Sequence, residues 1–304
     1  MIKVDNLSKQ FSKKLAVDNI SFQIVSGKVT GFLGPNGAGK STTMRLMLGL
    51  DSGTGKTTFD GKKLYEYAEP AKIVGILLEA KAFHPTRTPR NHLKILAEAG
   101  QIPMARVDEV LDIVGLKSEA KGKPGKFSLG MSQRLGIAAA LLGNPKYLFL
   151  DEPGNGLDPE GIAWLRQFLK SYADEGNGVF ISSHLLSEMS QIADDVVVIG
   201  RGKLIANTSI KELVSGNAHS SVFVRTNESA KLKKLLEDDK LSYTASDGGL
   251  EISGVKTDKI GLLAAKANIP ILELTTRSAS LEDVFLEITE GTEEFQAHEP
   301  KGKK

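Results

Sequence analysis

The chain has 304 residues, 40% of them hydrophobic, which suits one large packed domain with a smaller one. Its 39 basic and 37 acidic residues nearly balance, which argues against nucleic acid as a partner. Without cysteine there is no disulfide framework or thiol nucleophile, and without an apolar run near ~18 residues or a signal peptide we expect a soluble, cytoplasmic protein.

Short strand-like runs open the chain, at 2–7, 17–24 and 29–33. Between the first two lies Phe11, in the polar stretch 8–14. The residues around it leave two interpretations equally open. Phe11 is either an aromatic of a small core or a ring that stacks on a nucleotide base.

The segment after the third run matches G-x-x-x-x-G-K-[ST], the phosphate-binding loop of P-loop NTPases. Its glycines lack a Cβ, so the backbone N–H groups can point inward. Lys40 supplies a charge for the β- and γ-phosphates, and the Ser41 hydroxyl is a hard ligand for Mg²⁺. The helix that follows favours an anion at its N-terminus. The predicted nucleotide-binding residues here are Gly34, Pro35, Asn36, Gly37, Ala38, Gly39, Lys40, Ser41 and Thr42.

A second Gly-Lys-Thr sequence, at 53–57, fails the motif because the first glycine it requires falls at Leu50. We interpret 51–61 as a turn between two strands. A strand over 73–78 then ends at Glu79.

Three helices are predicted in the middle of the chain. One begins at Thr88, with the threonine as cap and a proline in the first helical position. An apolar i, i+3, i+4, i+7 pattern predicts a second over 107–114, and the third runs from Ser128 through Leu142.

The buried-strand run 147–150 ends in Asp151 and Glu152. An apolar strand that ends in aspartate is the second half of a P-loop NTPase site, where the aspartate holds the Mg²⁺ shell. Glu152 is placed to polarise an attacking water. A pair of helix-capping acids is the alternative, which the phosphate loop disfavours.

A break at 156–159 begins a helix that carries Trp164, which we expect in the core. The next strand, 179–183, ends at His184. A lone histidine is usually structural, but ligands gather at this end of the strands in open α/β sheets. Two more strands follow, at 195–199 and 203–206.

The remainder predicts a second domain. A linker at 215–220 precedes 221–290, whose order strand, helix, strand, strand, helix, strand is the ferredoxin-like pattern, with a last helix from Ser280. The polar segment 291–304 is expected to be disordered.

The order and spacing of these motifs in 1–214 resemble the ATP-binding subunit of an ATP-binding cassette (ABC) transporter. Residues 128–132 follow Phe127 where that family has Leu-Ser-Gly-Gly-Gln, with Leu129 and Met131 as departures. Glu79 stands where the family has the Q-loop glutamine. Both variants, and the segment 280–286, are similar to those of two-component exporters of drugs and peptide antibiotics, the bacitracin-resistance type.

The resemblance implies a P-loop NTPase α/β cassette over 1–214, with a parallel core sheet, an antiparallel β subdomain and a helical subdomain at about 86–142. It implies a homodimer that binds ATP and Mg²⁺, in which the Lys40 loop of one subunit faces Ser128 and Gly130 of the other. A separate membrane permease would dock near the loop after Glu79, which places the subunit on the cytoplasmic face of the membrane. The site residues it implies are Glu152 and His184 for catalysis, Phe11 for the adenine ring, Asp158 in the D-loop, and Ser41, Glu79 and Asp151 for the metal.

Two other functions stay open. A cassette protein of translation or DNA repair would carry two cassettes or a long coiled coil, and this chain shows neither. A soluble ATP-dependent sensor that regulates a partner without transport is compatible with the ferredoxin-like domain. The sequence does not identify a transported substrate, since the permease would determine it.

Overall fold

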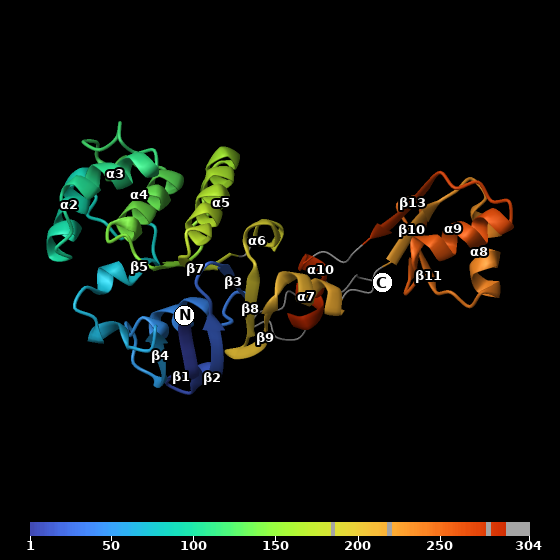
Figure 1. Ribbon diagram of the computed structural model, residues 1–304, viewed down its shortest axis with the longest axis horizontal. Coiled ribbons are helices and arrows are strands. Elements are labelled where there is room, and N and C mark those ends of the chain that lie inside the picture. The colour runs from blue at the N-terminus through green and yellow to red at the C-terminus, as the bar shows by residue number, and fades with distance from the viewer. Residues whose placement is uncertain (184–185, 218–220, 278–280, 290–304) are drawn as a thin grey trace, which may run out of the picture. The chain divides into compact units, whose positions relative to one another are not determined.

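The most apolar runs of the chain form a central six-stranded sheet (Figure 1). The computed structural model describes residues 1–183, 186–217, 221–277 and 281–289. Across the sheet the strands pair in the order β5-β6-β7-β3-β8-β9, all parallel except β9. Every residue of β3, β6 and β7 is buried, as in a parallel sheet covered on both faces. The strands are β3 (Val29–Leu33), β5 (Val74–Leu77), β6 (Tyr147–Leu150), β7 (Gly178–Ser182), β8 (Asp195–Gly200) and β9 (Lys203–Ser209).

A second, antiparallel sheet has the order β2-β1-β4, with β1 (Ile2–Phe11), β2 (Lys14–Ile24) and β4 (Thr54–Phe59). Strand β4 shows that the interpretation of 51–61 as a turn is wrong. The glycines at 53 and 55 and the Asp60-Gly61 turn signal obscured this strand, which forms because it pairs along β1 from Ile2↔Phe59 to Ser8↔Thr54. Pairing also extends β1 to Phe11, beyond the predicted run 2–7.

Aromatic rings join the two sheets. Phe22 of the antiparallel sheet lies 6.1 Å from Phe32 and 5.9 Å from Phe180, and Phe32 and Phe180 lie 4.9 Å apart, between ring centroids. Phe59 of β4 meets Phe149 of the central sheet in the same way, at 6.0 Å. Such pairs add to the burial energy, so the two sheets are fixed to one another.

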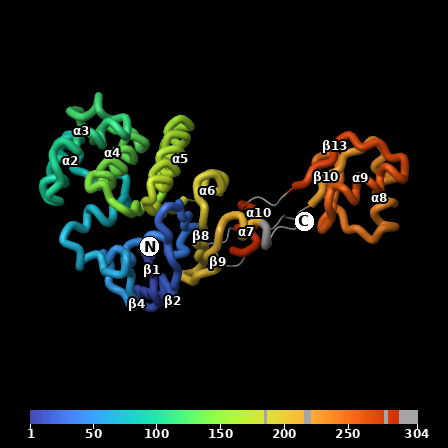
Figure 2. The backbone as a smooth tube through the Cα atoms, viewed as in Figure 1, coloured from blue at the N-terminus to red at the C-terminus, as the bar shows by residue number. Residues whose placement is uncertain are grey.

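Helices follow the strands as the sequence predicts. Figure 2 shows α2, α3 and α4 side by side, across the central strands from β1, β2 and β4. The Thr88 hydroxyl caps α2 by accepting from the Asn91 N–H. The helices of this region are α1 (Lys40–Met47), α2 (Pro89–Ala99), α3 (Ala105–Ile113), α4 (Leu129–Leu141), α5 (Pro159–Asp174) and α6 (Leu186–Ile192), with 3-10 turns at Leu64–Glu66, Pro70–Lys72 and Pro124–Lys126.

Trp164 lies on α5 and is half-buried, so its prediction as a core residue is wrong. Its ring stacks on Phe168, with centroids 5.6 Å apart. The Arg134 guanidinium of α4 lies 4.9 Å from the centroid of the Trp164 ring. The tryptophan therefore bridges α5 and α4.

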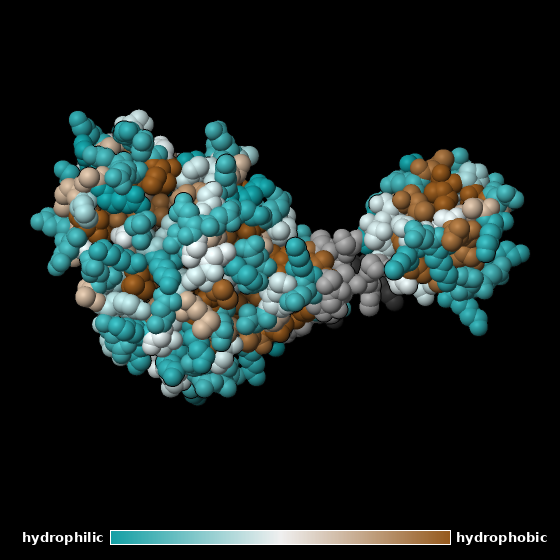
Figure 3. Space-filling view, viewed as in Figure 1, coloured by the Kyte–Doolittle hydropathy of each residue, from teal (hydrophilic) through white to brown (hydrophobic). Residues whose placement is uncertain are grey.

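The chain divides into two compact units, Met1–Ser209 together with Thr289, and Ile210–Ile288. The predicted linker 215–220 overlaps the end of α7 (Ile210–Asn217), and 218–220 and the tail 291–304 lie outside the described residues. In the view of Figure 3 hydrophilic residues cover most of the surface of each unit, and smaller hydrophobic areas lie among these residues.

The second unit has the predicted ferredoxin-like topology, with the antiparallel order β11-β12-β10-β13. One face of its sheet packs against α8 and α9 through a core that includes Val222, Leu236 and Ile260. On the other face the Arg277 guanidinium lies 3.9 Å from the centroid of the Phe223 ring. The elements after α7 are β10 (Ser221–Arg225), α8 (Ser229–Asp238), β11 (Tyr243–Ser246), β12 (Gly249–Ser253), α9 (Thr257–Lys266), β13 (Glu273–Arg277) and α10 (Leu281–Thr289).

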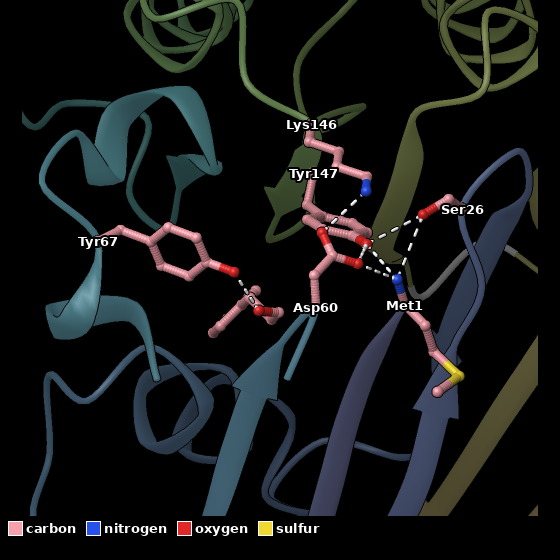
Figure 4. A network of polar contacts seen from close by, with 7 residues as sticks. Met1, Ser26, Asp60, Tyr67, Lys146 and Tyr147 are labelled. Carbon is pink, nitrogen blue, oxygen red and sulfur yellow. Dashed lines mark hydrogen bonds and ion pairs between the residues drawn. The ribbon is translucent and has the colours of Figure 1, made fainter. Parts of the chain in front are cut away.

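A polar network around Asp60 ties the antiparallel sheet to β6 (Figure 4). The Asp60 carboxylate accepts from the Lys146 ammonium at 2.8 Å, from the Tyr147 hydroxyl at 2.9 Å and from the Met1 ammonium at 2.6 Å. Burial alone would raise the pKa of Asp60, but the hydrogen bonds from Lys146, Met1 and Tyr147 outweigh it and lower the pKa to about 2. The ionised carboxylate is therefore the stabilising form.

We expect Asp60→Asn to lower the free energy of unfolding at pH 7 by about 1 kcal/mol, since the network is partly exposed and loses its anion. Because the pKa is lowered from 3.8 to about 2 on folding, this contribution is present above pH 3.8 and disappears as the pH falls towards 2. Urea unfolding of both proteins between pH 7 and the acid range measures it. Glu69→Gln, which breaks an exposed ion pair with Lys72, is the control, and an equal pH dependence in all three proteins would contradict the prediction.

Candidate nucleotide-binding site

The predicted phosphate loop connects β3 to α1, which begins at Lys40. Gly37 and Gly39 have φ angles of 81° and 102°, in the left-handed region that favours glycine. A Cβ on Gly39 would lie 2.5 Å from the Ala16 carbonyl oxygen of β2, and one on Gly34 would lie 2.5 Å from the Ile199 carbonyl oxygen. The glycines are therefore required by backbone conformation and by close packing, and they fix the loop against its neighbours.

The Lys40 ammonium folds back over this loop. It donates to the Gly34 carbonyl at 2.6 Å and to the Pro35 carbonyl at 3.4 Å. Burial lowers the pKa of Lys40, while the charges of Glu152 and Asp151 act in the opposite direction. The partly desolvated Lys40 ammonium is therefore suited to bind an anionic ligand such as a phosphate.

Asp151 lies at the end of β6 and joins two other elements of the site. One carboxylate oxygen accepts from the Ser41 hydroxyl of α1 at 2.6 Å, and the other accepts from the Ser182 hydroxyl at the end of β7. A hydroxyl and a carboxylate are hard oxygen donors that suit Mg²⁺. A bound Mg²⁺ would neutralise charge that develops on the phosphates.

The residues that the structure describes contain no group of three or more histidine and acidic side chains that could hold a metal alone. Mg²⁺ typically takes one or two carboxylates and completes its shell with water and substrate phosphates, and the adjacent Ser41 hydroxyl and Asp151 carboxylate fit that requirement. Glu79 is exposed and lines a cavity of about 510 Å³ together with Ser41 and Asp151. Its predicted role at the metal remains a prediction.

Glu152 follows Asp151 in a left-handed conformation, with a φ of 51°. Its backbone N–H donates to the Ser182 hydroxyl at 2.9 Å. Its carbonyl accepts from the side-chain amide of Gln133, on α4, at 3.0 Å. Sequence reasoning singled out neither Ser182 nor Gln133. Their only signals were a position two residues before His184 and a position directly after the segment 128–132.

Most of the phosphate loop, Asp151 and Glu152 line one cavity of about 470 Å³. Phe11 stands at its wall and is 50% exposed, so it does not belong to the core. The Lys9 ammonium lies 4.8 Å from the centroid of its ring. The cavity can therefore hold a molecule with a flat apolar end and an anionic end. Its lining residues are Phe11, Lys14, Ala16, Pro35, Asn36, Gly37, Ala38, Gly39, Lys40, Ser41, Thr42, Asp151 and Glu152.

Five of the predicted site residues that the structure describes do not line this cavity: Gly34, Glu79, Ser128, Gly130 and Asp158. Ser128 caps α4 by accepting from the Met131 N–H at 3.1 Å, and Asp158 caps α5 by accepting from the Gly161 N–H at 2.9 Å. Gly130 is buried, and a Cβ there would lie 2.6 Å from the carbonyl oxygen of Gly156. His184 lies outside the described residues.

A family model described as ABC transporter matches residues 17–155, and a family described only as a domain of unknown function matches 220–282. The bacitracin transport ATP-binding protein BcrA of Bacillus licheniformis is 38% identical, over 96% of this chain and 98% of its own. The linearmycin resistance ATP-binding protein LnrL of Bacillus subtilis is 31% identical over 95% and 98%. A solved ATP-binding subunit of an ABC transporter superposes with a TM-score of 0.65 at 26% identity, over 71% of this chain and 92% of its own.

A P-loop NTPase cassette with a nucleotide cavity and relatives of nearly the same length define the class of protein. The chain belongs to the ATP-binding subunits of ABC transporters, and the predicted resemblance to the bacitracin-resistance type is confirmed. Such subunits bind ATP with Mg²⁺ and hydrolyse it to drive transport through a separate permease.

We expect Phe11→Ala to weaken ATP binding by ~1–3 kcal/mol, because base–aromatic stacking contributes about that much. Phe11→Tyr keeps the ring and should bind as the wild type does. Calorimetric titration with ATP measures both. Unchanged affinity of Phe11→Ala would show that the exposed ring serves another purpose.

Glu152→Gln should reduce the rate of ATP hydrolysis ~10²-fold or more, because the amide cannot accept a proton from the attacking water. ATP binding should persist, since Lys40 and Ser41 are unchanged. Phosphate release and equilibrium ATP binding test the two statements, with Glu160→Gln, in the exposed first turn of α5, as control. Hydrolysis near the wild-type rate would show that Glu152 is not the catalytic base.

Proposed function

We propose that this chain powers the export of a peptide antibiotic or a similar amphipathic compound, as a homodimer bound to a separately encoded permease on the cytoplasmic face of the membrane. The observation that carries the proposal is the match over nearly the full length of both chains to BcrA of Bacillus licheniformis, which is named as a bacitracin transport protein. A lantibiotic transport ATP-binding protein of Streptococcus pyogenes, 39% identical over 67% of this chain and 89% of its own, supports it.

The positions of Ser128, Gly130 and Asp158 support the homodimer. None of them lines the cavity that holds Lys40 and Glu152 in the same subunit. Ser128 stands at the N-terminus of α4, where a helix favours an anion. In the proposed dimer this end of α4 meets the nucleotide in the Lys40 loop of the partner, and each site is completed by the other subunit.

The cavity beside Glu79 supports a permease contact. Apolar side chains make up much of its wall, including Leu78, Phe83 and Leu96. Burial lowers the pKa of His92 in this wall, and the charge of Arg87 lowers it further, which favours the uncharged ring. Charged Arg45, Glu79 and Asp151 also line this cavity, and its largely apolar remainder suits insertion of a short amphipathic helix from a partner. Among the residues that the structure describes, no helix is long and apolar enough to cross a membrane, so the proposed transport pathway belongs to that partner.

A regulatory cassette without transport is the second candidate, favoured by one observation. The second unit folds around its own hydrophobic core, so it can act as a module in its own right. Purification of the full chain from detergent-solubilised membranes decides between the two. The proposal expects a partner with several membrane-spanning helices and ATP hydrolysis that rises with added bacitracin-like peptide, and a partner that lacks such helices would overturn it.

We expect Ser128→Arg to abolish ATP-dependent dimerisation of Glu152→Gln protein while each subunit still binds ATP, because the long side chain would occupy the phosphate position of the partner. Ser128→Ala, which loses the same helix cap but adds no bulk, controls for the ~1 kcal/mol that a lost cap costs. Size-exclusion chromatography with and without ATP measures dimerisation. An ATP-dependent dimer of Ser128→Arg would exclude the proposed arrangement.

A further inference from the structure

Helix α4 contacts both ends of the segment that carries the proposed catalytic base, residues 152–156. At one end Gln133 donates its amide hydrogen to the Glu152 carbonyl at 3.0 Å. At the other, Gly130 is packed so closely on the Gly156 carbonyl that a Cβ would lie 2.6 Å from it. The helix that begins at Ser128 is thus attached to this segment of its own subunit.

The backbone of Glu152 needs this support. Its φ of 51° is in the left-handed region, which costs a residue with a side chain roughly 1 kcal/mol or more. Three hydrogen bonds hold it there: its N–H donates to the Ser182 hydroxyl, and its carbonyl accepts from the Gln133 amide and, at 3.2 Å, from the Asn155 N–H. The direction of the side chain depends on the backbone, so the Gln133 bond contributes to where the carboxylate lies.

Gln133 is an energetically unfavourable residue at its buried position. It is 4% exposed, between the buried Ser132 and Leu135, and its side-chain oxygen has no hydrogen-bond donor among the residues the structure describes. A buried, unpaired carbonyl costs ~1–3 kcal/mol, and leucine would fill a similar volume without that cost. The contact that distinguishes glutamine from leucine here is the donated hydrogen bond to Glu152.

We propose that Gln133 is a positioning residue for ATP hydrolysis, which ties the placement of Glu152 to the seating of α4. The inference rests on the proposed function, in which the N-terminus of α4 binds the nucleotide of the partner subunit. The N-terminus of α4 binds the ATP of the partner subunit, and Gln133 on the same helix positions the Glu152 that acts on the ATP of its own subunit. Catalysis in each site then depends on engagement of both.

The first test is Gln133→Leu in the full-length chain. We expect kcat for ATP hydrolysis to fall ~10- to 100-fold, as for a misplaced catalytic group, while affinity for a non-hydrolysable ATP analogue changes less than about twofold. Emission of Trp164, which lies against Arg134 of α4, should stay unchanged and show that the helix is still seated. Ile137→Val, one turn further along α4 and fully buried, is the control for a small loss of stability.

The second test is Gln133→Glu, which keeps the shape of the side chain. An ionised carboxylate cannot donate to the Glu152 carbonyl, but a protonated carboxyl can, and burial raises the pKa of such a group. We therefore expect the ratio of its kcat to that of the wild type to rise as the pH falls from about 8 to about 6. This variant also decides the matter if Gln133→Leu does not fold.

Wild-type kcat in Gln133→Leu, or a pH-independent ratio in Gln133→Glu, would overturn the inference. These outcomes differ from failure of the proposed function. A wild-type chain that hydrolyses ATP without forming an ATP-dependent dimer would refute the dimer, whatever the Gln133 variants do.

Discussion

The structure depends on the parallel pairing of β3, β6 and β7, which brings the carboxyl ends of three buried strands to one edge of the sheet. Ser41 and Asp151 are 110 residues apart in the chain, yet their side chains meet at 2.6 Å at this edge. Ser182, from the third strand, holds the other carboxylate oxygen. The apolar strands and the phosphate loop that surround this polar cluster leave its side chains few other arrangements, and this stabilises it.

The nucleotide site was predictable from the sequence where consecutive residues carry its function. The loop from Gly34 to Thr42 and the pair Asp151-Glu152 carry their function in local pattern, because backbone shape and strand position follow from the residues themselves. Gln133 and Ser182 could not be found in this way. Both act through hydrogen bonds to groups that folding brings near: Gln133 donates to the Glu152 carbonyl, and Ser182 contacts the Asp151 carboxylate and the Glu152 N–H. A glutamine in an apolar helix looks the same in sequence whether or not it has such a partner.

In the fold, too, features that follow from local sequence were predicted and features that depend on distant contacts were not. The ferredoxin-like order after residue 220 was predicted because its strands and helices alternate clearly in hydrophobic period. Strand β4 was missed because Gly55 and Lys56 have weak strand preference, and β1 rather than the segment itself makes it a strand. Trp164 was misplaced because size suggests burial, whereas its ring covers the junction between α5 and the Arg134 side chain.

The close approach of Gly39 to the Ala16 carbonyl has a consequence for selectivity. Ala16 lies on the strand that forms a hairpin with the strand ending in Phe11, so the aromatic ring and the phosphate loop belong to one rigid frame. Because the distance between the ring and the loop is fixed, the cavity would select a ligand by the distance from its flat end to its last phosphate. A ring that stacks does not read the hydrogen-bonding edge of a base. Selection in this cavity would therefore distinguish a nucleoside triphosphate from a monophosphate far better than one purine from another.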